Sequence, residues 1–350
     1  MVSDVISQIP TVDVHAHAVV PAAFGFVAGE PGFQREREAD LASFGEETMK
    51  NQQTMLEEIG PLLTNLKQRL EKMDRQGVDV QLVSLSPAHY HTWAGPELAR
   101  SITRTVNEGI AELCTARPDR LAGLGMVPVQ HPDIAEAELV HAVTEFGLKG
   151  VEISTTAPGI ELADEEFKPF WTRTEELGAL VFIHPWGYTL GPRLNRHYLA
   201  NIVGQPVETI VALSHIIFSG LLDRHPDLRL LAAHGGGYLP FYTGRSDHGW
   251  RGRPEIRTPE NPPRSYLRRL YFDSLVYEPG ALASLVRQVG SDRVLLGSDF
   301  PFDMGSEDPV GHVHATPGLN AEERAAICGG NAAKLPRLLP VEADPETEER

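Results

Sequence analysis

The chain has 350 residues, and its 31 basic and 48 acidic side chains give a formal net charge of −17. Such an acidic surface repels nucleic acid and anionic membranes, which argues against both as partners. The length and a hydrophobic fraction of 41% suit an α/β fold, a single (β/α)8 TIM barrel domain with an insertion, which we place at residues 1–340.

The first residues, MVSDVISQIP, have neither the basic nor the apolar region of a signal peptide. No later segment reaches ~18 uninterrupted apolar residues, the length of a membrane-spanning helix. Cys114 and Cys328 are isolated thiols without disulfide spacing, as expected in a reduced compartment. We therefore expect a soluble, cytoplasmic protein.

The first predicted strand covers 12–15 and ends in His15-Ala16-His17. Residues 22–64 follow as a polar, acidic insertion with helical patches and no predicted strand, which we expect to form a lid or an edge subdomain. A regular alternation begins at Leu66, with a helix over 66–77 that ends at Gly77 as its C-cap.

The rest of the chain alternates short apolar runs with helical patterns. The runs predict strands over 80–85, 121–127, 150–153, 180–183, 228–233, 269–272 and 294–296. Helices are predicted over 96–116, 133–146, 164–177, 207–219, 280–289 and 321–327. Strands that mostly alternate with helices favour a closed parallel barrel over an open doubly wound sheet, because no glycine-rich nucleotide-binding turn follows the first strand. The acidic tail, 341–350, is expected to be disordered.

Candidate metal ligands follow four of the predicted strands. His15 and His17 lie on one side of the first strand, because side chains at i and i+2 face the same way. His184 follows the fifth strand, His234 the sixth and Asp299 the eighth, and the carboxyl ends of barrel strands meet on one face. Two histidines on a strand also occur for packing alone, but this convergence favours a metal site. The mixture of nitrogen and carboxylate ligands suits zinc with an open position for water.

These five candidates are more than a zinc site with an open position needs. A zinc-bound water has a pKa lowered to ~7, and a neutral imidazole suits the removal of its proton. We assign this role to His234. The alternative, a second metal bridged by a carbamylated lysine, needs a lysine at the end of the fourth strand, but Lys149 precedes that strand and Glu152 lies within it. One metal ion per subunit is therefore expected.

Three glycines, Gly235, Gly236 and Gly237, follow His234. They lack the Lys-Ser/Thr ending of a phosphate-binding loop. Because glycine has no side chain, we expect this run to leave room for a metal or a substrate beside the backbone, and the aromatic run after it could begin a helix.

Several segments together resemble the amidohydrolase superfamily, and within it the 2-amino-3-carboxymuconate 6-semialdehyde decarboxylases and the related γ-resorcylate decarboxylases. The segments are VDVHAH at the start and RLEKMDRQGVDVQ, FIHPWG, AAHGGGYLPFYTGRSDHGW, YFDSLVYEP and VLLGSDFPF between residue 66 and about residue 335. The insertion at 22–64 does not resemble the family in detail, which leaves the identity of the substrate open.

The resemblance implies a role for each motif residue. Zinc would be bound by His15, His17, His184 and Asp299, with His234 as the base. Arg69 would hold a substrate carboxylate, and Arg245 would reach into the site of a neighbouring subunit, which implies a homodimer. A forked, permanently charged donor suits a carboxylate, although a surface ion pair is the alternative for both arginines. Trp186 and Phe302 are implied to line the pocket, with core packing as the alternative, and Tyr198 stands where the family has a pocket-lining tryptophan.

These observations predict a zinc-dependent, non-oxidative decarboxylase that acts on an unsaturated or aromatic carboxylic acid, such as aminocarboxymuconate semialdehyde or a hydroxybenzoate-like acid. No organic cofactor is required. The alternative is a zinc-dependent hydrolase of an amide, lactone or C–C bond that uses the same site. A third class, a metal-bound interaction protein without activity, fits poorly with a full set of five metal-facing residues.

Overall fold

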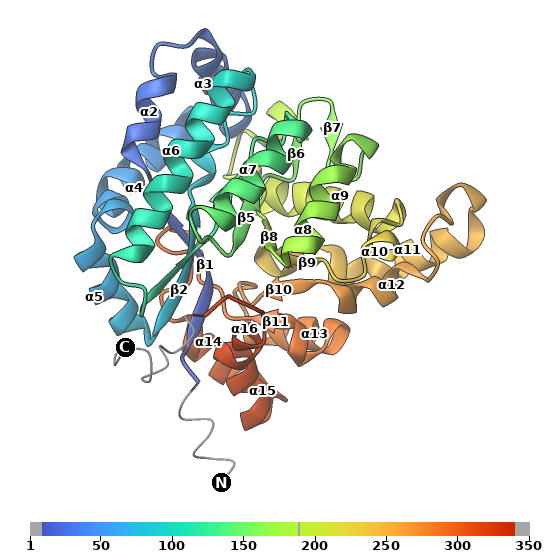
Figure 1. Ribbon diagram of the computed structural model, residues 1–350. Helices are drawn as coiled ribbons and strands as arrows, with labels where there is room; N and C mark the ends of the chain where they lie inside the picture. Colours follow the sequence, from blue (N-terminus) through green and yellow to red (C-terminus); the bar gives the residue numbers. More distant parts are fainter. Residues whose placement is uncertain (1–8, 188–189, 340–350) are drawn as a thin grey trace, which may run out of the picture.

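The computed structural model describes residues 9–187 and 190–339, and the predicted tail 341–350 lies outside them. Parallel strands occupy the centre, and helices surround them (Figure 1). The barrel strands are β1 (Val12–Ala18), β2 (Val80–Leu85), β3 (Leu121–Gly123), β4 (Gly125–Met126), β5 (Gly150–Ile153), β8 (Leu180–Ile183), β9 (Arg229–Ala232), β10 (Tyr271–Asp273) and β11 (Val294–Leu295).

Hydrogen bonds join these strands into one closed ring. One sheet has the order β1-β2-β3 and the other the order β4-β5-β8-β9-β10-β11. β3 and β4 are two parts of the single strand predicted over 121–127, interrupted at Leu124, whose N–H donates to the carbonyl of Val83 at 2.8 Å. The N–H of Val14 donates to the carbonyl of Leu296 at 2.8 Å, which connects β1 to the end of β11. The described residues therefore form the closed parallel barrel that the sequence predicts.

Helices follow the strands in the expected alternation. They are α5 (Leu66–Gln76), α6 (Pro96–Thr115), α7 (Pro132–Thr144), α8 (Lys168–Leu177), α9 (Gln205–Phe218), α10 (Leu221–Arg224), α11 (Leu239–Gly252), α12 (Pro263–Tyr266), α13 (Pro279–Val289), α14 (Pro309–Ala315), α15 (Ala321–Ala325) and α16 (Asn331–Ala333). A short antiparallel pair, β6 (Thr156–Ala157) and β7 (Ile160–Glu161), follows β5.

Local sequence explains where α5 begins and ends. The side chain of Asn65 accepts a hydrogen bond from the N–H of Gln68, which caps the first turn. Gly77 has a left-handed φ of 68° after the last turn, so the predicted C-cap is confirmed. Two strand boundaries differ from the prediction by two or more residues, and several others by a single residue. β1 extends to Ala18 and includes both histidines, and β10 starts only at Tyr271 because a 3-10 turn precedes it.

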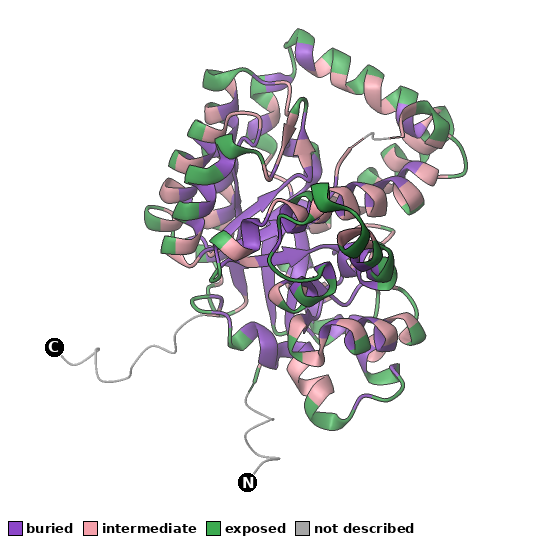
Figure 2. Ribbon diagram, turned by 90° about the vertical axis from the view of Figure 1, so that its right-hand side faces the viewer, coloured by how far each residue is buried: buried purple, intermediate pink, exposed green. Residues whose placement is uncertain are grey.

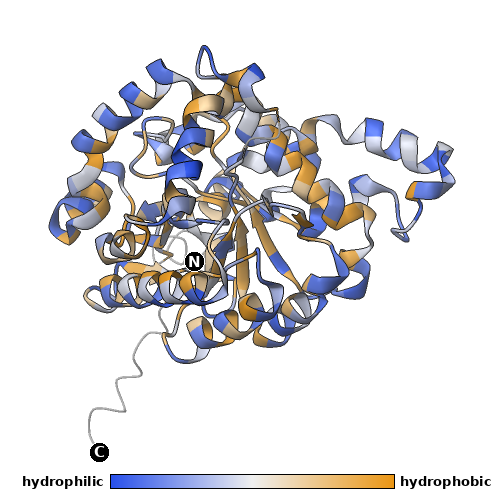
Figure 3. Ribbon diagram, turned by 90° about the horizontal axis from the view of Figure 1, so that it is seen from above, coloured by the Kyte–Doolittle hydropathy of each residue, from blue (hydrophilic) through white to orange (hydrophobic). Residues whose placement is uncertain are grey.

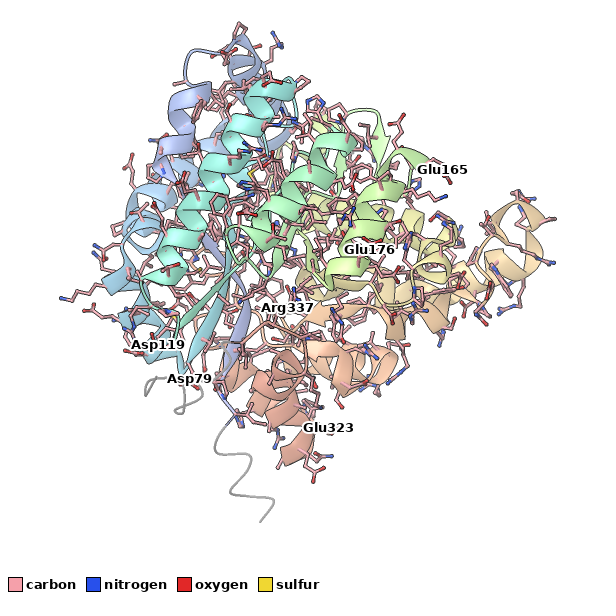
Figure 4. The ribbon with its side chains drawn as sticks, viewed as in Figure 1. Asp79, Asp119, Glu165, Glu176, Glu323 and Arg337 are labelled. Carbon is pink, nitrogen blue, oxygen red and sulfur yellow. The ribbon has the colours of Figure 1, made fainter. Side chains whose placement is uncertain are left out.

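The insertion consists of three helices, α2 (Pro21–Val27), α3 (Pro31–Phe44) and α4 (Glu46–Thr64). α2 and α3 lie at the top of Figure 1. Figure 4 labels Asp79 and Asp119, which precede β2 and β3, at the lower end, so the strands point their carboxyl ends toward the end of the barrel where α2 and α3 lie.

The strands are buried on both faces (Figure 2) and apolar (Figure 3). In β8, Val181 and Ile183 belong to the apolar cluster shared with the helices, while Leu180 and Phe182 belong to a second cluster of buried apolar residues. This two-residue period is typical of a strand that is covered on both sides.

One described segment, Ala200–Phe218, has the length and apolar content of a membrane-spanning helix. It comprises a π-helical turn and α9, whose residues Leu213, Ile216 and Ile217 are buried in the main apolar cluster. Its apolar character is therefore explained by packing on the barrel.

Candidate metal centre and cavity

Four side chains meet at the carboxyl ends of the strands. His15 and His17 lie on β1, His184 follows β8, and Asp299 follows β11. One ligand atom from each lies within 4.8 Å of the other three, and all four residues are buried. Nε2 of His15 and Nε2 of His17 are 3.1 Å apart. The predicted convergence of these four residues is confirmed.

The donor set fits a divalent metal ion. Neither ring nitrogen of His184 has a hydrogen-bond partner within the described part of the chain, although both are buried. Oδ1 of Asp299 lies 3.4 Å from Nε2 of His15 and 3.2 Å from Nε2 of His17. Such closely spaced nitrogen and carboxylate donors can bind zinc or another first-row metal.

Burial and charge within the cluster shift the pKa values of Asp299, His15 and His184. Burial alone would raise the pKa of Asp299, but His15 and its other histidine neighbours lower it well below the usual value. Burial would lower the pKa of His15, but Asp299 and Asp273 raise it to about 10. Burial, followed by the nearby histidines, lowers the pKa of His184 well below its usual value. Without metal, therefore, His15 is a cationic imidazolium at neutral pH, and metal binding must displace one of its two ring protons.

Asp273, the last residue of β10, orients the cluster from outside it. Its Oδ2 lies 2.7 Å from Nδ1 of His15, which directs Nε2 of that ring toward the other ligands. The N–H groups of His234 and Gly235 also donate to this carboxylate, at 2.8 and 2.7 Å. The sequence interpretation missed Asp273, although it ends the seventh strand much as Asp299 follows the eighth.

His234 lies beside the cluster but is more exposed than the ligands. Its ring centroid is 5.2 Å from those of His15 and His184, and its Nε2 is 3.7 Å from Oδ2 of Asp299. The glycines that follow have left-handed φ values, and a Cβ on Gly237 would lie 2.5 Å from the carbonyl oxygen of Pro206. These glycines are thus required by a tight turn packed against α9, a different reason from the predicted approach of a ligand.

A cavity of about 440 Å³ opens onto the metal cluster, and His234 lines it. The aromatic residues predicted to line it, Trp186, Tyr198 and Phe302, all do so. The insertion contributes one side of α4 to its wall. The other lining residues are Phe44, Glu47, Thr48, Asn51, Gln52, Met55, Leu56, Ser86, Pro87, Ala88, His184, Pro185, His197, Asn201, Gln205, Asp299, Asp303 and Met304.

The structure does not bring Arg69 to this cavity. Its side chain is 1% exposed, and its guanidinium donates to the carbonyl oxygen of His17 and to Oε1 of Gln81, the latter at 2.9 Å. The guanidinium also lies 4.7 Å from the ring centroid of Phe300. Burial lowers the pKa of Arg69 to about 10, so the group remains a cation at neutral pH. The guanidinium thus makes hydrogen bonds inside the protein, and its burial contradicts the alternative of a surface ion pair. Its contact with a substrate carboxylate stays a prediction.

Arg245 is exposed on α11 and is not among the described cavity-lining residues. Its predicted role concerns the site of a neighbouring subunit, so this single chain does not test it. Glu152 lies within β5 as expected, buried, with Oε2 3.6 Å from Nδ1 of His17.

Comparison with known proteins identifies the family. The amidohydrolase family model matches residues 12–338. The chain belongs to the amidohydrolase family. The 2-amino-3-carboxymuconate-6-semialdehyde decarboxylase of Dictyostelium discoideum is 35% identical over 274 residues, which cover 78% of this chain and 76% of that protein. The γ-resorcylate decarboxylase of Rhodococcus jostii (strain RHA1) is 29% identical over 291 residues, covering 77% and 87%.

Among solved structures, the fold is similar to that of a 5-carboxyvanillate decarboxylase from Novosphingobium aromaticivorans, complexed with manganese and 4-hydroxy-3-methoxy-5-nitrobenzoic acid. The TM-score is 0.77 at 22% identity, and the match covers 94% of this chain and 96% of that chain. The decarboxylase branch that the sequence motifs indicate is thus confirmed by the named relatives.

Proposed function

We propose that this amidohydrolase-family chain is a metal-dependent, non-oxidative decarboxylase of an aromatic or unsaturated carboxylic acid. The observation that carries the proposal is the cluster of His15, His17, His184 and Asp299 at an aromatic-lined cavity. The relatives named above, whose names are those of decarboxylases, support the same reaction.

The four clustered residues would hold the metal ion. When bound, the ion supplies a fixed positive charge that stabilises negative charge on the reacting acid. Zinc fits the three imidazoles and one carboxylate, and manganese, which the Novosphingobium aromaticivorans protein holds, is the alternative to be distinguished by metal analysis.

His234 would first take a proton from water in the site, the base role expected from the sequence, and would then supply that proton to the reacting carbon. Its ring lies beside the cluster and lines the cavity, so its Nε2 can reach a substrate atom held there. The proton passes to the carbon that bears the carboxylate, the bond to that carboxylate breaks, and carbon dioxide leaves. The bonding electrons return to the ring or double bond, so the step requires no oxidant.

The cavity walls would position the acid and limit access of water. Trp186, Tyr198 and Phe302 offer flat faces for an unsaturated or aromatic framework. The α4 helix of the insertion contributes to the same wall, which supports a lid role for residues 22–64.

We also propose a cytoplasmic homodimer. On α11 and just before it, Tyr238 and Tyr242 are 43% and 64% exposed, close in sequence to the exposed Arg245. Exposed aromatic side chains together with arginine are typical of protein interfaces. A particle of twice the chain mass in light scattering would support the dimer, and a stable monomer would contradict it.

The reaction is tested by incubating the metal-loaded chain with hydroxybenzoates and with aminocarboxymuconate semialdehyde. We expect release of carbon dioxide and a product shorter by one carboxyl group. Loss of the acid without carbon dioxide, with ¹⁸O from labelled water in the product, would instead establish the hydrolase alternative.

A further inference from the structure

Gln205 occupies an unusual position in the chain. It is the first residue of α9 and directly follows the π-helical turn Ala200–Gly204. Such turns are rare and are frequently found at functional sites. Two residues shortly before the turn, His197 and Tyr198, have left-handed φ values of 59° and 58°, which non-glycine residues seldom adopt. These left-handed conformations raise the free energy of the folded backbone in this segment.

The π-helical turn leads directly into Gln205, whose side chain lies at the cavity. The residue is 5% exposed and lines the cavity. Neither its Oε1 nor its Nε2 has a hydrogen-bond partner within the described part of the chain. A buried amide that makes no hydrogen bond destabilises the folded protein, so such groups are normally satisfied by protein, water or ligand.

The rest of the cavity shows which ligand group would satisfy this amide. The described lining residues include no lysine or arginine, and the two acidic lining residues away from the metal cluster, Glu47 and Asp303, are exposed. Gln205 therefore faces the cavity as a neutral group with one acceptor and two donors. A hydroxyl or amino group, which both donates and accepts, matches it better than an apolar group.

Tyr198 lines the same cavity as Gln205. Burial raises the pKa of its hydroxyl, and Asp303 and Asp299 add to the shift, so the group stays protonated and can donate a hydrogen bond. The cavity thus combines two neutral polar side chains with the aromatic rings of Trp186 and Phe302.

We propose that Gln205 is a specificity-determining residue that binds a neutral hydroxyl or amino substituent of the substrate, apart from the carboxylate that reacts. The substrate is then an aromatic or unsaturated acid that carries such a substituent. This inference rests on the proposed decarboxylase function, but it concerns recognition and can be measured without turnover.

The test compares equilibrium binding of matched acids to the metal-loaded full chain. The probes are benzoate and its hydroxy and amino derivatives, each with the substituent at the 2, 3 or 4 position. The variants are Gln205→Leu, which removes the donors and the acceptor, and Gln53→Leu as a control. Gln53 is exposed on α4, where its amide donates a hydrogen bond to Glu57 at 3.1 Å, and it is not among the described cavity-lining residues.

We expect the native chain to bind at least one derivative about 10-fold or more tightly than benzoate. Gln205→Leu should reduce the affinity for that derivative to the level of benzoate, leave benzoate binding unchanged, and keep or raise the Tm because an unsatisfied buried amide is removed. The control should retain the preference. Equal loss for benzoate and the derivative, a fall in Tm with general loss of binding, or no preference in the native chain would overturn the inference.

The same preparations separate this inference from the proposed function. Selective binding that depends on Gln205, without release of carbon dioxide from any probe or from aminocarboxymuconate semialdehyde, would refute the decarboxylase reaction and leave the recognition role standing. Release of carbon dioxide with a preference that Gln205→Leu does not change would refute the recognition role alone.

Discussion

Nδ1 of His15 lies 2.7 Å from Oδ2 of Asp273, and both side chains are fully buried. The same carboxylate accepts hydrogen bonds from the backbone N–H groups of His234 and Gly235. One aspartate therefore orients a metal ligand and also fixes the turn that carries the proposed proton donor. Such partners of ligating histidines determine which ring nitrogen faces the metal.

Asp273→Asn should weaken metal binding about 10- to 100-fold, because an amide is a poorer acceptor for the His15 ring N–H. Metal affinity is measured by competition with a chromogenic chelator. Asp119→Asn is the control, because Asp119 is exposed, pairs with Arg117 and precedes β3, at the amino ends of the strands, whereas the cluster lies at their carboxyl ends. If both variants bind metal as tightly as the native chain, Asp273 has no orienting role.

His234→Gln should retain one metal ion per chain and lose about 10²- to 10⁴-fold in the rate of carbon dioxide release, the usual contribution of a positioned acid or base. Metal content is measured by elemental analysis and the rate with the best substrate found. His248→Gln serves as the control, since His248 is exposed on the same α11 helix that follows the turn. Full activity in His234→Gln would eliminate this residue as proton donor.

Arg69→Leu should lower the free energy of unfolding by about 3–5 kcal/mol, because it removes a buried cation near Asp13 and the hydrogen-bond donor to Gln81. The measurement is urea unfolding followed by circular dichroism. Arg75→Leu, at an exposed position of α5, should change this free energy by less than about 0.5 kcal/mol.

The same variant tests the role in substrate binding that the family resemblance implies for Arg69. Because the guanidinium lies outside the cavity, the folded fraction of Arg69→Leu should keep the native KM. A large rise in KM with little loss of stability would show instead that Arg69 reaches the substrate.

His89 should make the protein less stable in mild acid. Its Nε2 accepts a hydrogen bond from the N–H of Val20 at 3.2 Å, and its ring stacks on Phe24 at 4.7 Å. Burial, with a contribution from His91, lowers the pKa of His89 to about 3. Between pH 6.5 and pH 3 the unfolded chain therefore binds a proton that the folded chain does not, so stability falls as the pH falls through this window.

The effect is measured as the difference between the native chain and His89→Gln in urea unfolding at pH 7 and pH 5.5. Over this interval the free energy of unfolding of the native chain should fall by about 1 kcal/mol more than that of the variant. This follows because one proton taken up on unfolding changes the free energy by ~1.4 kcal/mol per pH unit below pH 6.5. Other titrating groups are common to both proteins and cancel. Parallel pH profiles would mean that His89 can take up a proton in the folded state.

Much of the metal site follows from the sequence. Short apolar runs that mostly alternate with helical segments predict a parallel barrel, and in such a barrel the carboxyl ends of all strands lie on one face. This topology brings His15, His17, His184 and Asp299 together, since each lies on a strand or within a few residues of a strand's carboxyl end. The aromatic lining residues follow the same strand ends.

Other features depend on packing between segments that local spacing does not describe. The sequence places Arg69 on α5, but only the approach of that helix to β1 turns its guanidinium toward the carbonyl of His17. Likewise, the helical character of α4 is visible in the sequence, but its position across the cavity is not. The direction of Gln205 depends on the π-helical turn before it.

The sequence alone thus determined the barrel and the gathering of its metal ligands, because backbone periodicity and strand direction fix both. Only the tertiary structure decided which polar side chains face the cavity and which form hydrogen bonds inside the protein. The reason is that a side chain's partners are set by the rotation and packing of whole helices against distant strands.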